Sequence, residues 1–259
     1  MKIKNTHLDT LAGTHTSVLV FDCEFWRVYG TRGYKSIPHL DEMFMPREVG
    51  GFLLTKNKDD TWTYHPSFFV TLDPPDLDIS FISSQFATVS KKTADELDII
   101  QASLVMPWAA AYKHSLPQEQ HQILEEGIDV YLNDANIKKH RKTKAWYKKF
   151  IELYSSSLVV VKGLYDMEAF ENACKYHGVP YKKPLGIYDI AEWNLKSRQK
   201  CGTAKLEGTY DCIINEVPDS TGKKKRLRDI LPLGEAHDPT SDAAMTLLVA
   251  LYIVSTRRM

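Results

Sequence analysis

Two acidic side chains, Asp22 and Glu24, stand at the end of an apolar run near the start of the chain. The run, residues 17–26, reads SVLVFDCEFW, and its β-branched and aromatic residues predict a buried strand. Residues two apart on a strand project from the same face. Two neighbouring carboxylates beside a core repel each other and lose hydration, so this pair predicts a bound cation.

Further acids and one histidine follow at the ends of later predicted elements. Asp166 follows an apolar strand at residues 157–162, and His237 and Asp242 stand at the start of the last predicted helix. Taken singly, Asp166 and Asp242 could be helix caps, and His237 is one of nine histidines. Taken together, the four carboxylates suit Mg²⁺ or Mn²⁺. Two such ions about 4 Å apart can stabilise the attacking and the leaving oxygen when a phosphodiester bond is hydrolysed. A histidine can accept the proton of the attacking water.

The elements that must position these residues predict an α/β fold in a single domain, residues 1–259. The five predicted strands, an antiparallel meander followed by two later strands, cover residues 17–26, 51–56, 67–72, 157–162 and 186–190. Apolar residues at helical spacing predict helices at residues 93–111, 117–133, 137–150, 167–177 and 191–200, and from Pro239 onward.

Three stretches have less certain roles. Residues 1–16 are expected to be a polar lead-in. Residues 27–50 predict a long loop with cations among tyrosines, which is either a substrate flap or a plain surface excursion. The basic run at residues 137–150 could follow phosphates. The spacing of Trp146 and Phe150 instead favours an amphipathic helix with its aromatic side chains in the core.

Composition sets broad limits on function. The chain has 259 residues, is 43% hydrophobic and has a formal net charge of +0, so any attraction to nucleic acid must come from local patches. It has no apolar run for a bilayer and no signal sequence, so we expect an intracellular protein, cytoplasmic rather than nuclear. No cysteine pair has the C-x-x-C spacing, which argues against zinc and favours free thiols. The four cysteines are Cys23, Cys174, Cys201 and Cys212.

The order of these residues resembles the DEDDh family of 3′-to-5′ exonucleases, of the RNase T and proofreading-exonuclease type, within the ribonuclease H-like superfamily. The family's first motif, D-x-E on the first strand, is matched by Asp22 and Glu24 in VLVFDCEF. Its second motif, an apolar strand leading through a small-residue turn to an aspartate, is matched by Asp166 in VVVKGLYD. Its third, H-x-x-x-x-D entering a helix, is matched by His237 and Asp242 in HDPTSD.

This resemblance implies a mixed five-stranded ribonuclease H-like sheet with residues 17–26 as a central strand. It also implies removal of nucleotides from RNA or DNA 3′ ends, two Mg²⁺ or Mn²⁺ ions on the four carboxylates, and His237 as general base. Three residues depart from the family pattern. Phe25 and Trp26 replace small residues and either stack on the terminal base or lie in the core. Lys162 replaces an early asparagine and is expected to contact a phosphate.

Three other functions remain open at this stage. A catalytically weak or inactive module of the same fold, binding nucleic acid or protein, would bind no metal at Asp22. An HD-type phosphohydrolase is suggested by His237 and Asp238, but it needs further histidine ligands on helices, and the sequence offers no convincing set. An endonuclease of the same fold would cut a circular substrate.

Overall fold

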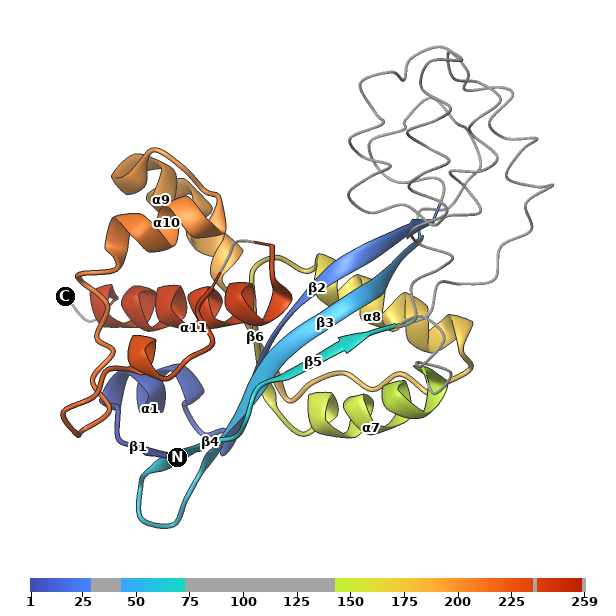
Figure 1. Ribbon diagram of the computed structural model, residues 1–259, viewed down its shortest axis with the longest axis horizontal. Helices are drawn as coiled ribbons and strands as arrows, with labels where there is room; N and C mark the ends of the chain where they lie inside the picture. The colour runs from blue at the N-terminus through green and yellow to red at the C-terminus, as the bar shows by residue number, and fades with distance from the viewer. Residues whose placement is uncertain (29–42, 73–142, 235–236, 258–259) are drawn as a thin grey trace.

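The computed structural model describes residues 1–28, 43–72, 143–234 and 237–257 of the chain (Figure 1). The strands in these ranges are β1 (Lys2–Ile3), β2 (Ser17–Val28), β3 (Met43–Lys56), β4 (Trp62–Tyr64), β5 (Phe68–Thr71), β6 (Leu158–Val161) and β7 (Gly186–Asp189). The helices are α1 (Thr6–Ala12), α7 (Thr143–Ser155), α8 (Tyr165–Tyr176), η3 (Ile190–Trp193), α9 (Asn194–Cys201), α10 (Leu206–Ile213), η4 (Leu227–Asp229) and α11 (Pro239–Thr256).

The described strands form one mixed, open sheet packed against helices, which confirms the predicted α/β class. The strand order is β1-β4-β3-β2-β6-β7, and β5 pairs with β3 as well. As predicted, β2 is central, because it pairs antiparallel with β3 on one side and parallel with β6 on the other. The meander is confirmed too, since β3 pairs antiparallel with both β4 and β5.

The alternation of side chains along β2 divides the core into two layers. Leu19, Phe21 and Cys23 pack in the cluster that holds α7 and α8. Val18 and Val20 project to the opposite face and pack with α1 and α11. Figure 1 shows α7 and α8 on one side of the sheet and α11 with α1 on the other. By the same alternation, Asp22 and Glu24 share the α11 face.

The predicted strand count of five is wrong, because the described residues contain seven strands. The predicted polar lead-in at residues 1–16 contains β1, which pairs with β4, and α1. Asn5 caps α1 by accepting hydrogen bonds from the N–H groups of His7 and Leu8. Ile3 and Leu8 are fully buried, so this segment belongs to the core. Its apolar residues are too few and too widely spaced to give a clear periodic signal.

The predicted loop at residues 27–50 is wrong at both ends, since β2 continues to Val28 and β3 begins at Met43. Residues 29–42 lie outside the described residues. Pro46 suggested a loop, but it sits beside a β-bulge, where the register shifts between Glu24 and Phe25. A proline is tolerated there because the ladder is already interrupted.

Most predicted helices in the described ranges are confirmed. These are α8, the η3–α9 segment and α11. In α7, Phe150 lies in the core and Trp146 packs against it, so the amphipathic reading of this basic segment is confirmed. The predicted helices at residues 93–111 and 117–133, and residues 137–142 of the basic run, lie outside the described residues.

The prediction that the cysteines are free thiols is correct for two of the four. Cys23 and Cys174 are free and buried, whereas Cys201 and Cys212 form a disulfide that joins the end of α9 to α10. Their separation of 11 residues carries no recognisable pairing motif, and only the packing of α9 against α10 brings them together. Within the described ranges, no helix has both the length and the apolar character to cross a bilayer.

Candidate functional site

The middle of β2, just past its parallel pairing with β6, meets the first turn of α8. Because β6 runs parallel to β2, its carboxyl end and the helix that follows it reach the same edge of the sheet. Asp166, in that first turn, is buried, and its Oδ1 accepts a hydrogen bond of 3.0 Å from the backbone N–H of Cys23. The aspartate of the second predicted motif is therefore bonded to the backbone between the two acids of the first motif.

The start of α11 supplies the third part of the site. Asp238 caps this helix, because its Oδ1 accepts hydrogen bonds of 2.7 Å from Thr240 N–H and 3.2 Å from Ser241 N–H. His237 precedes the cap with a φ of 65°, in the left-handed region. The Asp242 carboxylate accepts the backbone N–H of His237, which helps to hold this conformation.

A glycine lets α11 approach the sheet closely. Gly50 of β3 lies against the first turn of α11. A Cβ at this position would collide with the backbone nitrogen of Thr240, and would lie 2.6 Å from Thr240 Oγ1 and 2.7 Å from the carbonyl carbon of Pro239. The absence of a side chain at Gly50 therefore sets how close Asp242 comes to the strand that carries Glu24.

The first and third motifs meet at this contact. One carboxylate oxygen of Glu24, one of Asp242 and a ring nitrogen of His237 all lie within 4.8 Å of one another. Glu24 and Asp242 are partly buried and His237 is exposed. An arrangement of this size can share a cation or exchange a proton.

The electrostatics join Asp22 to the same group. Burial raises the pKa of the Asp22 carboxyl well above its ordinary value. The neighbouring charges, in order of effect Asp166, Asp242 and Glu24, raise this pKa further, and Lys162 lowers it. The other three predicted carboxylates and Lys162 therefore lie within electrostatic reach of Asp22.

The other three carboxyls also have raised pKa values, and burial is the main cause in each. Burial raises the pKa of Asp166 from 3.8 to about 7, against the opposing effect of the Cys23 backbone N–H. Burial also raises the pKa of Glu24, which Arg47 and His237 partly offset, and the pKa of Asp242, which His237 partly offsets. Ionising this group of acids together is unfavourable without a cation between them.

Two carboxylates of the predicted set share a small volume with a histidine, and the other two do not. Glu24 and Asp242 lie with His237 in a group within 4.8 Å, whereas Asp22 and Asp166 are not part of that group and are linked to it by electrostatic interactions. Carboxylate oxygens are the ligands that Mg²⁺ and Mn²⁺ prefer. Like-charged carboxyls at a partly buried site are also the situation that a bound cation relieves. The residues that would hold such ions are Asp22, Glu24, Asp166 and Asp242.

The three predicted substrate contacts have different outcomes. Phe25 packs against the core cluster around α7 and α8. This agrees with the alternative that Phe25 lies in the core and does not stack on a base. The side chain of Trp26 lies outside the described residues. Lys162 is partly buried and near enough to lower the pKa of Asp22, so it lies beside the carboxylates.

Sequence reasoning missed three charged residues around the site. The charge of Arg47 lowers the pKa of Glu24. Arg47 was missed because it lies in the segment that the sequence predicted as a loop. Glu207 of α10 raises the pKa of Asp242, but α10 had no clear helical pattern in the sequence. Asp189, at the end of β7, accepts a hydrogen bond from Gly163 N–H in the turn before α8. Only the order of the strands in the sheet could have indicated this contact.

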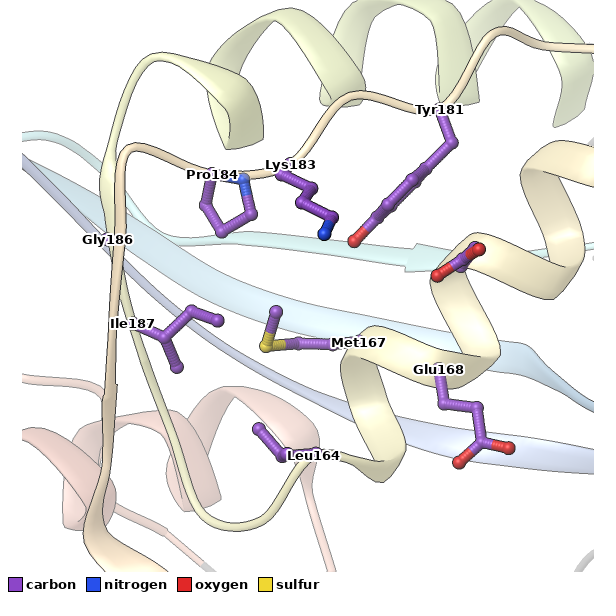
Figure 2. A pocket seen from close by; sticks show the side chains of 9 residues that line it. Leu164, Met167, Glu168, Tyr181, Lys183, Pro184, Gly186 and Ile187 are labelled. Atoms are coloured by element: carbon purple, nitrogen blue, oxygen red, sulfur yellow. The ribbon is translucent and has the colours of Figure 1, made fainter.

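A separate pocket of about 390 Å³ lies between α8 and β7 (Figure 2). Its walls include the apolar side chains of Leu164, Met167 and Ile187, with Lys183 and Tyr181 on the opposite side. None of the predicted site residues lines it. The pocket is therefore distinct from the group of carboxylates, although the turn that ends at Leu164 borders both.

Comparison of the chain with protein-family models and with curated proteins gives no match. The arrangement of the chain's own residues is therefore the basis for proposing a function.

Proposed function

We propose that this protein is a metal-dependent 3′-to-5′ exonuclease of the DEDDh type that hydrolyses phosphodiester bonds at RNA or DNA 3′ ends and releases 5′-mononucleotides. One observation carries the proposal. Three segments that are far apart in the sequence meet at the middle of the central strand β2. Each segment taken alone has an ordinary structural explanation, but such explanations do not require the three to meet.

The sheet gives independent support. A central strand that is antiparallel to one neighbour and parallel to the other agrees with the ribonuclease H-like arrangement proposed for this chain. The parallel strands β6 and β7 follow on one side. On this proposal, β1 and β4 extend the opposite edge beyond the five strands of that arrangement.

The four carboxylates, Asp22, Glu24, Asp166 and Asp242, would hold two Mg²⁺ or Mn²⁺ ions. When bound, these ions supply a Lewis acid for the phosphate and lower the pKa of a water nucleophile. A ring nitrogen of His237 would accept a proton from the attacking water. Its exposed position beside Glu24 and Asp242 suits this exchange with solvent. Lys162 places a positive charge where the phosphate of the terminal nucleotide would bind.

The direct test uses end-labelled RNA and DNA strands with free or blocked 3′ ends, together with circular forms of each. We expect stepwise release of 5′-mononucleotides from free 3′ ends with Mg²⁺ or Mn²⁺. We expect no product with a chelator or from blocked ends. Cleavage of circles would instead indicate an endonuclease. Failure to degrade any strand, in a protein that binds no Mn²⁺ by calorimetry, would contradict the proposal.

The role of His237 can be separated from metal binding with the substitution His237→Asn. Asparagine tolerates the left-handed backbone at this position and lacks an imidazole base. Turnover should fall by about 100- to 10,000-fold, because the proton acceptor is lost. Mn²⁺ affinity should change little, because the proposed ligands are the carboxylates, and a large loss of affinity would instead make His237 a metal ligand. Calorimetry and single-turnover kinetics on the same preparation would check both, and unchanged turnover would exclude His237 as the base.

A further inference from the structure

The turn between β6 and α8 is held by a side chain from the next strand. Asp189 ends β7, and its partner across the ladder is Val161, the last residue of β6. The Oδ1 atom of Asp189 accepts a hydrogen bond of 2.6 Å from Gly163 N–H and a second of 2.8 Å from Ala191 N–H. One carboxylate oxygen therefore ties the β6–α8 turn to the start of η3.

This turn decides where two site residues lie. Lys162 immediately precedes Gly163, and Asp166 follows it by three residues. Gly163 has a φ of 90°, so the chain changes direction sharply there. The N-cap position of α8 is Leu164, whose side chain makes no capping hydrogen bond. The hydrogen bond that Asp189 Oδ1 accepts from Gly163 N–H is therefore a side-chain contact that holds this turn.

The remaining link runs from Asp166 to β2. Asp166 Oδ1 accepts the Cys23 N–H at 3.0 Å, and this bond forms only if the first turn of α8 is held at the right distance from β2. Displacing a catalytic group by about 1 Å can cost roughly 100-fold in rate. A residue that fixes the turn therefore affects the site without touching substrate or metal.

We infer that Asp189 is a positioning residue of this site, acting through Gly163 on Asp166 and Lys162. The inference rests on the proposed function for its effect on catalysis, but not for its effect on the Cys23–Asp166 hydrogen bond. Asp189 acts through its Oδ1 atom, which accepts the two backbone hydrogen bonds. Its negative charge is not required, because asparagine offers an acceptor at the same place.

The test compares Asp189→Ala with Asp189→Asn in the full-length protein. With alanine, both backbone donors lose their partner. We expect kcat for 3′-end hydrolysis to fall by about 10- to 100-fold, with a smaller change in KM, and the Kd for Mn²⁺ to rise by a similar factor. With asparagine, the acceptor remains, and most of the kcat and Mn²⁺ affinity should return.

A second readout needs neither activity nor metal. In protein labelled with ¹⁵N-cysteine, the amide of Cys23 reports its hydrogen bond to Asp166 through its rate of hydrogen exchange. This rate should rise in Asp189→Ala and return towards the wild-type value in Asp189→Asn. The amide of Cys174, inside α8, should be unaffected, because it lies away from the turn.

Asn5→Ala is the matched control for a general loss of stability. Asn5 Oδ1 also accepts two backbone N–H groups, from His7 at 3.0 Å and Leu8 at 2.9 Å, but at the start of α1. This variant should lower the thermal midpoint and leave kcat, Mn²⁺ affinity and Cys23 exchange unchanged.

Three results would overturn the inference. These are wild-type Cys23 exchange in Asp189→Ala, an asparagine variant as impaired as the alanine variant, or the same losses in Asn5→Ala. An inactive wild-type protein whose Cys23 exchange still responds to Asp189→Ala would contradict the proposed nuclease function and support the positioning role.

Discussion

The surroundings of the Asp22 carboxyl disfavour its charged form, although the proposed chemistry requires that form. It is desolvated and lies near three other carboxylates, with Lys162 as a compensating charge. Without a metal ion, this arrangement raises the pKa of Asp22 and reduces the stability of the folded state at neutral pH. Sites selected for function commonly lower stability in this way.

Asp22→Asn should therefore stabilise the metal-free protein and abolish catalysis. Removing the charge should raise the free energy of unfolding at pH 7, because burial and the neighbouring carboxylates disfavour the ionised form of Asp22. On the proposed function, turnover should fall by at least about 1,000-fold, because a proposed metal ligand is removed. Thermal denaturation with and without Mn²⁺, together with the nuclease assay, would check both effects.

Asp219→Asn is the control for this variant. Asp219 is also buried, but it forms an ion pair with Arg228. The same substitution should therefore destabilise the protein by about 1–3 kcal/mol at that position. A loss of stability in both variants would contradict the electrostatic account of Asp22.

The raised carboxyl pKa values should also make the free energy of unfolding depend on pH. The pKa of Asp166 is raised from 3.8 to about 7 by burial. Between these values the folded protein keeps a proton that the unfolded chain has released. The free energy of unfolding of the metal-free protein should therefore fall as the pH rises from about 4 to about 7.

Added Mn²⁺ competes with those protons, so the rise it causes in the thermal midpoint should be small near pH 5 and large near pH 8. Thermal scans across this range, with Mn²⁺ or with chelator, would measure it. An Mn²⁺ effect that does not change with pH would argue against carboxylate ligands.

Among the elements, the contact between β3 and α11 is the tightest constraint on the site. Gly50 leaves no room for a methyl group against Thr240. Gly50→Ala should push the start of α11 away from the sheet and separate Asp242 and His237 from Glu24. We expect a loss of about 1–3 kcal/mol in stability from overpacking. We also expect at least about 100-fold lower turnover from the displaced ligand.

Gly234→Ala is the comparison for Gly50→Ala. A methyl group at Gly234 meets open space, and this residue is also close in sequence to His237. It should leave turnover and stability near wild type. Denaturant titration and kinetics would compare the two, and normal turnover in Gly50→Ala would show that α11 can move without disturbing the site.

The elements that the sequence predicted well are those with a continuous pattern. The β2 strand, the β6–α8 unit and α11 each carry a run of apolar residues bounded by recognisable turn or cap residues. The missed elements lack that pattern. The strand β1 has two residues, β4 has three, and Pro46 interrupts β3 where a bulge accommodates it.

The site was partly predictable for a similar reason. Clear apolar patterns mark the elements that carry or adjoin Asp22, Glu24, Asp166, His237 and Asp242, so residue type and order could point to them. Asp189 and Glu207 could not be selected, because their relevance comes from strand order and helix packing. Arg47 was missed because its strand was not recognised.

At the scale of the whole molecule, the site lies at the boundary between the two layers of the core. Asp166 belongs to α8, which packs on one face of the sheet, and Asp242 belongs to α11, which packs on the other. The strand β2 separates the layers and carries the remaining two acids. The geometry of the site therefore depends on both layers being complete.

The hydrogen bond between Cys23 and Asp166 spans 143 residues of sequence. Contacts this distant require parallel strand pairing, which closes large loops and forms slowly compared with local structure. During refolding, helical content should return before this contact does. On the proposed function, recovery of catalysis would then report the completion of the native topology, and a newly made chain would become active only after α11 had docked on the sheet.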